Sequence, residues 1–131
     1  MPEENINTQK DSFHVQGELG DVQIAVEVVA VIAGIAATEV EGVESMNGSG
    51  DSIQKDIISR LGMKVLSKGV RINIEEDSVA VDLSVNLAYG YNIPEVTRNI
   101  QERVKSEIEH MTGLRVTQVN VSVVDVELDS E

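Results

Sequence analysis

The fold of this chain is decided by residues 79–128, which read VAVDLSVNLAYGYNIPEVTRNIQERVKSEIEHMTGLRVTQVNVSVVDVEL. The first nine residues alternate between large apolar and small or polar side chains, which is typical of a strand with one buried face. Residues 93–111 place apolar side chains three or four positions apart, which predicts a helix. Residues 114–128 predict a second long strand. Its inward-facing set changes phase between Val123 and Val124, which indicates a bulge.

The ends of this helix carry clear local signals. Asn92 and Glu95 have the spacing of a capping box, and Pro94 lies in the first turn, where proline is tolerated. Gly113 is placed to end the helix. A strand, a helix and a further strand of these lengths form a right-handed crossover, so the two strands are expected to be parallel.

Two earlier segments complete the predicted fold. Residues 70–75 alternate strictly and form a hairpin with the strand that begins at Val79, across a turn at residues 76–78. Residues 25–40 predict a first helix, with Gly42 placed to end it. We therefore expect an α+β fold: a two-layer sandwich with a small mixed β-sheet, made of the hairpin and the right-handed βαβ crossover. Its two main helices lie on one face, and the other face is polar.

The predicted first helix is apolar around most of its circumference. Val26, Ala30, Ala33 and Ala37 form a ridge of mostly small side chains that permits close packing. A helix with so little polar surface is buried on most sides. Its cover is either another layer of the same domain or a second subunit, and the two are compatible.

The chain of 131 residues has the length of one domain. We expect residues 1–16 to form a disordered tail, because they contain no periodic pattern. Residues 17–128 are expected to form a single domain, with a flexible, amphipathic linker at residues 47–69. Residues 129–131 form an acidic end.

The charge balance argues against nucleic acid as a partner. The chain has 23 acidic and 10 basic side chains, and its net charge of -13 repels phosphate. The polar face of the predicted sheet also offers no aromatic side chain on which a base could stack. The residues expected on that face are Arg71, Asn73, Asp82, Ser84, Asn86, Asn120 and Ser122.

Nothing in the sequence indicates catalysis, a metal or a cofactor. The chain has no cysteine, and His14 and His110 have no partner at metal-ligand spacing. The glycine-rich stretch at residues 48–50 lacks the lysine and the spacing of a phosphate-binding loop. We therefore predict no catalytic, cofactor-binding or metal-binding residue, and a protein that is not an enzyme.

Residues 53–68 are the exception to the acidic composition. They carry four basic residues, and their apolar residues recur every fourth position, which is typical of a short cationic amphipathic element. Either this segment caps the core of its own domain, or it forms an interaction surface. The candidate interaction residues are Lys55, Arg60, Lys64 and Lys68.

Direct insertion into a membrane is not expected. The N-terminus lacks the features of a signal peptide, and the longest apolar run, Val28–Ala37, has ten residues, about half of a membrane-spanning helix. We therefore expect a cytoplasmic protein, unless a partner tethers it to a membrane.

Several motifs resemble the alkaline shock protein family, in order and over about residues 17–128. They are GDVQIA at 20–25, IAGIA at 32–36, GVESM at 42–46, YGYNIPEV at 89–96, MTGL at 111–114 and VNVSV at 119–123. The resemblance implies a Gram-positive envelope stress response protein that is abundant in the cytoplasm and self-associates. It also implies that a small integral membrane protein can hold the chain at the inner membrane face. No catalytic residues are known for that family. The resemblance also implies that the first helix begins near Ala25.

The sequence thus predicts a non-enzymatic stress protein of the cell envelope that acts as a self-associating cytoplasmic scaffold. It would reach the inner membrane face through a membrane-protein partner. The alternative is a small regulatory binding module that contacts a cytosolic enzyme or ligand and forms no scaffold. Large assemblies would favour the scaffold, and a discrete small oligomer with one partner would favour the module.

Overall fold

The computed structural model describes residues 12–47 and 68–128 and confirms the predicted α+β fold. The centre of its main sheet is strand β5 (Ser78–Ala88). Strand β6 (Arg115–Glu127) pairs with one edge of β5 in parallel, after the crossover through helix α5 (Ile93–Thr112). Strands β3 (Val43–Met46) and β4 (Val70–Ile74) pair with the other edge, both antiparallel.

Strands β3 and β4 lie end to end along β5. Met46 of β3 pairs with Val85, and Val70 of β4 pairs with Leu83, so only Ser84 separates the two ladders. The carbonyl of Ser84 accepts the Asn47 amide at 2.9 Å, and the amide of Ser84 donates to the Gly69 carbonyl at 2.8 Å. One edge of the sheet is therefore a strand that is interrupted and then resumed in the same direction.

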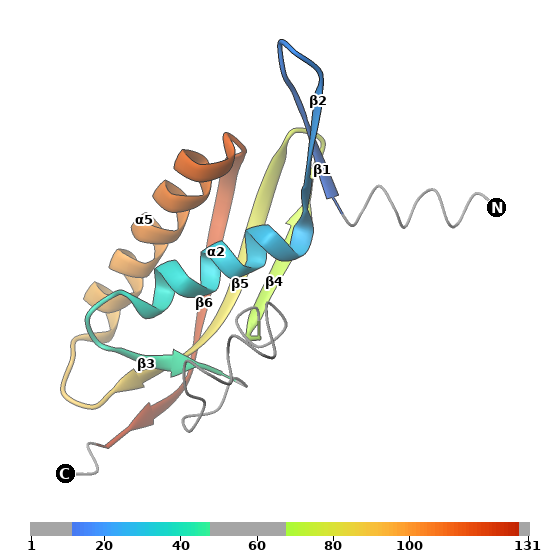
Figure 1. Ribbon diagram of the computed structural model, residues 1–131. Helices are drawn as coiled ribbons and strands as arrows, with labels where there is room; N and C mark the ends of the chain where they lie inside the picture. The colour runs from blue at the N-terminus through green and yellow to red at the C-terminus, as the bar shows by residue number, and fades with distance from the viewer. Residues whose placement is uncertain (1–11, 48–67, 129–131) are drawn as a thin grey trace.

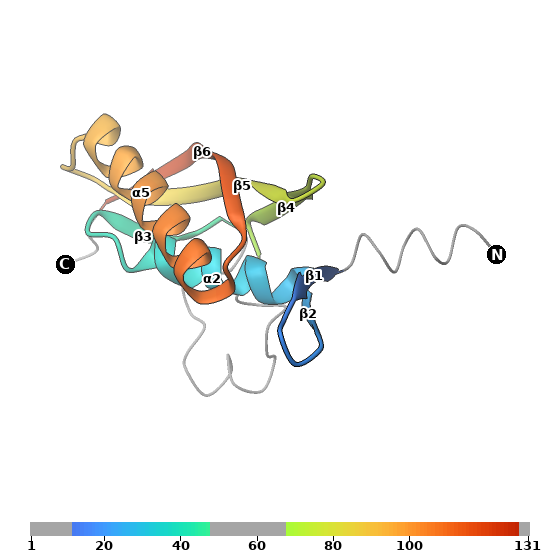
Figure 2. The ribbon, with the colours of Figure 1, turned by 90° about the horizontal axis from the view of Figure 1, so that it is seen from above.

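Both helices cover the same face of this sheet (Figures 1 and 2). Helix α2 (Val26–Thr38) follows strand β2 (Asp21–Ala25) directly, and its small residues Ala33 and Ala37 are fully buried. Small side chains let the two layers approach closely. The predicted row of mostly small side chains (Val26, Ala30, Ala33 and Ala37) therefore packs inside its own domain. The helix ends at Thr38, and Gly42 instead lies in the turn that the bond from the Val43 amide to the Val40 carbonyl closes.

The core lies between the helices and the sheet. On β5 every second residue points inward, and on α5 one helical stripe does so. The buried residues that point inward are Val79, Val81, Leu83, Val85 and Leu87 on β5, and Val96, Ile100, Val104 and Ile108 on α5.

The predicted bulge in the last strand is confirmed. Val85 pairs with Val123 and Asn86 pairs with Asp125, so Val124 has no partner on β5. A second irregularity leaves Thr117 out of the ladder, at the start of β6. Both extra residues increase the local twist of the strand.

The prediction of a disordered tail is wrong for residues 12–16. These residues form strand β1 (Ser12–Gln16), which pairs antiparallel with β2 (Asp21–Ala25) in a separate hairpin. Phe13 is the reason, because its side chain is only 7% exposed and joins the core cluster. A single buried aromatic residue leaves no periodic pattern in a sequence, so the sequence alone does not predict this strand.

Candidate interaction surfaces

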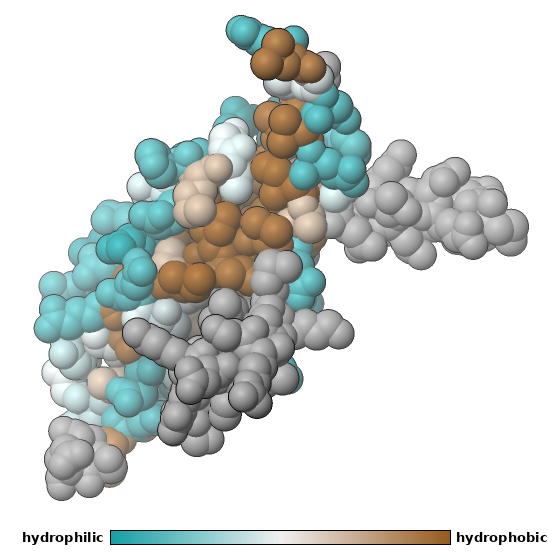
Figure 3. All heavy atoms as spheres, viewed as in Figure 1, coloured by the Kyte–Doolittle hydropathy of each residue, from teal (hydrophilic) through white to brown (hydrophobic). Residues whose placement is uncertain are grey.

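Helix α2 presents an apolar outer face in addition to its buried one. Val28 and Val31 are half-buried, and Ile35, one turn further, is 41% exposed. Figure 3 shows apolar surface that follows α2 and continues onto the β1–β2 hairpin, where Leu19 and Val22 are exposed. We call these five residues the α2 ridge. Apolar surface that is continuous over two elements is typical of a protein contact.

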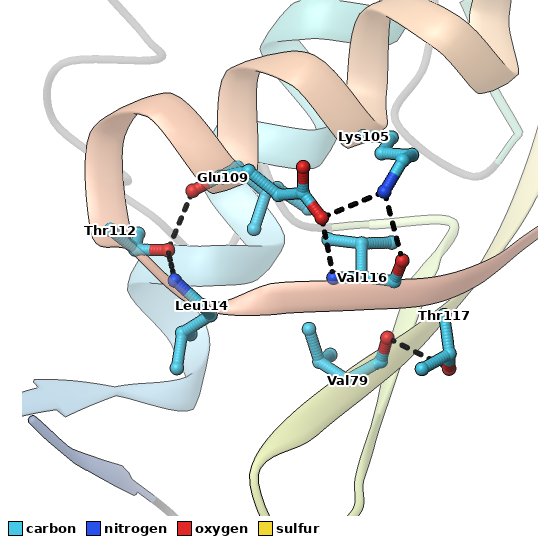
Figure 4. A network of polar contacts seen from close by, with 8 residues as sticks. Val79, Lys105, Glu109, Thr112, Leu114, Val116 and Thr117 are labelled. Carbon is cyan, nitrogen blue, oxygen red and sulfur yellow. Dashed lines mark hydrogen bonds and ion pairs between the residues drawn. The ribbon is translucent and has the colours of Figure 1, made fainter.

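The outer edge of β6 is capped along its first half by side chains of α5 (Figure 4). The Val116 amide donates to Glu109 at 2.9 Å, and the Val116 carbonyl accepts from Lys105 at 3.3 Å. Further along, the Val119 carbonyl accepts from Gln101 at 2.9 Å. Gln101, Lys105 and Glu109 are four residues apart and therefore lie in one row on the helix.

Glu109 is held in its ionised form by this arrangement. Lys105 donates to it at 2.8 Å. The hydrogen bond from Lys105, followed by the one from the Val116 amide, lowers the pKa of the Glu109 carboxyl from its ordinary value. The sequence shows the four-residue spacing, but only the fold shows that this row faces a strand edge.

The face of the sheet opposite the helices is polar, as predicted. Asp82 accepts hydrogen bonds from Asn120 at 2.9 Å and Asn73 at 3.1 Å, and these two bonds lower the pKa of its carboxyl. Beside it, Ser84 and Arg71 help to line a hollow of about 430 Å³. This face therefore offers a shallow polar depression at the point where β3 gives way to β4.

Asn86 lies on the same polar face but departs from its expected exposure. Its side chain is only 8% exposed, donates to Ser45 at 3.1 Å and accepts from Asn47 at 3.3 Å. Asn86 therefore helps to join β3 to β5.

The two histidines lie on different elements, and one of the four predicted basic residues is among those that the structure describes. His14 lies 2.9 Å from Asp21 across the β1–β2 hairpin, and His110 is exposed in the last turn of α5. Among residues 12–47 and 68–128, no three His, Cys, Asp or Glu side chains are grouped so that they could hold a metal ion. Lys68 is exposed before β4, whereas Lys55, Arg60 and Lys64 lie outside the described residues.

Within the part of the chain that the structure describes, neither helix has the length and apolar character needed to cross a bilayer.

The fold and these surfaces define a small two-layer α+β domain that offers an apolar ridge, a half-capped strand edge and a polar sheet face for contact. The chain belongs to the alkaline shock protein 23 family, whose model matches residues 14–128 and is described by a cell envelope-related function. This match confirms the resemblance seen in the sequence motifs.

Relatives from Gram-positive bacteria support this assignment. YqhY of Bacillus subtilis is 34% identical over 118 residues, which cover 90% of this chain and 85% of YqhY. Spy1535 of Streptococcus pyogenes is 39% identical over 106 residues, 80% of this chain and 78% of that protein. A stress response regulator gls24 homolog of Streptococcus pyogenes is 31% identical over 121 residues, 92% of this chain and 65% of that protein.

Solved structures also align with this chain, at low sequence identity. The nickel form of a variant of the MamM C-terminal domain aligns with a TM-score of 0.48 and 16% identity. The alignment covers 78% of this chain and all of that domain, 100%. The family and its relatives, and not these structures, support a role in stress or in the cell envelope.

Proposed function

We propose that this protein is a non-enzymatic scaffold of the envelope stress response that self-associates in the cytoplasm. The family's cell envelope-related function and the relative named a stress response regulator support the setting. The single observation that carries self-association is the α2 ridge. Full burial of one valine or isoleucine contributes about 1.5–3 kcal/mol, so several ridge residues covered together could hold two copies.

Recruitment to the inner membrane face is proposed to go through a small integral membrane protein. Basic residues near an anionic membrane contribute about 1 kcal/mol each, and the net charge of -13 opposes that attraction.

The contact surface for the partner or for a neighbouring copy is proposed to consist of four basic residues, Lys55, Arg60, Lys64 and Lys68. Charge reversal at Arg60, Lys64 and Lys68 is expected to weaken assembly or partner binding, and unchanged binding of both kinds would remove this surface from the proposal.

The test of the α2 ridge is the variant Ile35→Asp, followed by light scattering over a range of concentrations. Ile35 is exposed, so the substitution leaves the core intact but places a charge on the part of the α2 ridge that is most exposed on the helix. Ser106→Asp is the matched control, because Ser106 is exposed on α5 and gains the same charge. We expect the control to associate like the unchanged chain and Ile35→Asp to associate at least several-fold more weakly. Equal association of both variants would contradict a role for the ridge.

The polar hollow favours the second candidate function, a regulatory binding module. Its carboxylate, Asp82, is oriented by Asn73 and Asn120, and Arg71 supplies a positive charge at the same place. Such a mixed site suits a small polar ligand or a polar loop of a partner. A discrete small oligomer that binds one soluble partner, and loses it in the variant Asp82→Asn, would favour this function over the scaffold.

A further inference from the structure

We propose that the uncapped part of the β6 edge, residues 121–124, pairs antiparallel with the same residues of a second copy. This inference rests on the proposed self-association and names one surface that would produce it. The argument follows the backbone groups along the edge, because an unpaired strand edge is a template for a further strand.

The direction of each backbone group on β6 can be followed from its contacts. The amide and carbonyl of one residue point to the same edge, and the direction alternates along the strand. Val116 and Val119 point outward, because α5 side chains bond to them. Counting onward and allowing for the bulge at Val124, Val121, Val123 and Val126 also point outward.

The backbone groups of these outward-pointing residues differ in whether they have a hydrogen-bond partner. At Val126, the amide is already bonded to the carboxylate of Asp125 at 2.9 Å. On the part of the chain that the structure describes, β6 pairs with β5 alone, and no hydrogen bond reaches the outward groups of Val121 or Val123. The open window at residues 121–124 thus lies between the part of the edge bonded by α5 side chains and the Val126 amide bonded by Asp125.

A second copy fits this window in its hydrogen bonds and in its charge. On a twofold axis at Ser122, Val121 lies opposite Val123 of the partner subunit, and each pair exchanges two hydrogen bonds. The amide and carbonyl groups of Val121 and Val123 in each copy are then satisfied by one isologous contact. Residues 120–124 carry no charge, so two copies of a chain with net charge -13 can meet there. In this register Asp125 lies opposite a valine, Val119 of the partner subunit, so no like charges face each other.

Amide hydrogen exchange over a range of protein concentrations tests the pairing directly. We expect the Val121 and Val123 amides to exchange quickly in dilute protein and slowly in concentrated protein. The Val116 amide is the internal control, because its bond to Glu109 lies within one chain and does not depend on concentration. The proposal would be overturned if the protein associates and the exchange rates of the Val121 and Val123 amides, whether fast or slow, do not change with concentration.

A variant pair gives a second readout that does not depend on exchange rates. Val124 is 54% exposed on the bulge, so Val124→Lys leaves the core intact and adds a lysine to the edge. Ser106→Lys makes the same charge change on the exposed face of α5. We expect Val124→Lys to raise the dissociation constant of the dimer about tenfold relative to Ser106→Lys.

The outcomes separate this inference from the proposed function. If the unchanged chain is a monomer at every concentration, both fail. If it associates and Val124→Lys behaves like Ser106→Lys, only the edge pairing fails, and association through the α2 ridge stands. If the edge variant alone weakens association, the β6 edge is a self-association surface.

Discussion

Gly42 occupies a backbone position that only glycine fills without strain. Its φ is +102°, and a Cβ there would lie 2.9 Å from Val96 Cγ2 and 3.1 Å from the Tyr91 ring. We expect Gly42→Ala to lower the free energy of unfolding by about 1–3 kcal/mol. Gly90→Ala is the matched control, because Gly90 has a φ of +103° but nothing within 4 Å of its added Cβ. Urea unfolding of both variants separates the effect of the contacts of the added Cβ from the effect of the positive φ. Equal losses of unfolding free energy in the two variants would show that these contacts have no effect.

Glu109 is expected to titrate below the ordinary glutamate value of 4.5, because Lys105 and the Val116 amide favour its ionised form. A lowered pKa means that its stabilising contribution is present above 4.5 and is lost as the pH falls through the lower value. The measurement is the Val116 amide chemical shift against pH. The unchanged chain should show a midpoint below 4.5, and Glu109→Gln should show no such step. A midpoint at or above 4.5 would contradict the capping network.

Helix α5 depends on its N-terminal cap. The Asn92 side chain accepts the Glu95 amide at 2.9 Å, and Pro94 lies in the first turn. Asn92→Ala leaves that amide without its partner and is expected to cost about 1 kcal/mol, whereas Asn92→Asp keeps an acceptor and costs less. Thermal or urea unfolding measures the difference. Two variants of equal stability would show that the cap contributes nothing.

Elements with local signals could be predicted from the sequence. Asn92 and Gly113 mark both ends of α5, as expected. The phase change at Val124 marks the bulge, because a strand with one buried face must keep its apolar residues inward. Strand β1 could not be predicted, since its place depends on the burial of one residue, Phe13, by elements far along the chain.

The surfaces were harder to predict than the elements. The apolar character of α2 was visible, but which of its residues would be covered depends on the layer that packs against it. The row of Gln101, Lys105 and Glu109 was visible as a spacing, but its role as an edge cap depends on the tertiary position of β6. The residues predicted from charge alone, Lys55, Arg60 and Lys64, lie outside the described residues and remain a proposal.

At the scale of the whole molecule, net charge and apolar surface have opposite effects on association between copies of the chain. A charge of -13 on each copy repels the next, and salt screens this repulsion over about 3 Å at 1 M against about 10 Å at 0.1 M. We therefore expect association to strengthen with salt when the α2 ridge and the β6 edge make the contacts. Light scattering at low and high salt measures this. Weakening in salt would instead indicate that the basic residues of 53–68 meet acidic surface.

Two self-association surfaces on one chain would explain a scaffold better than one. An isologous contact at the β6 edge closes on itself and gives a dimer. A further contact through the α2 ridge would join dimers into an open assembly. Under this account, Val124→Lys and Ile35→Asp each leave a smaller, closed species, and the double variant is a monomer. Size-exclusion chromatography with light scattering tests the three variants, and large assemblies of the double variant would contradict the two-surface account.

The most direct test of self-association is the molar mass of the unchanged chain, measured by light scattering over about a hundredfold range of concentration. A reversible assembly grows with concentration by mass action, so this range reveals it. The account predicts a mass that rises with concentration and passes that of a dimer. A monomer mass at every concentration would contradict it and leave the binding module as the better function.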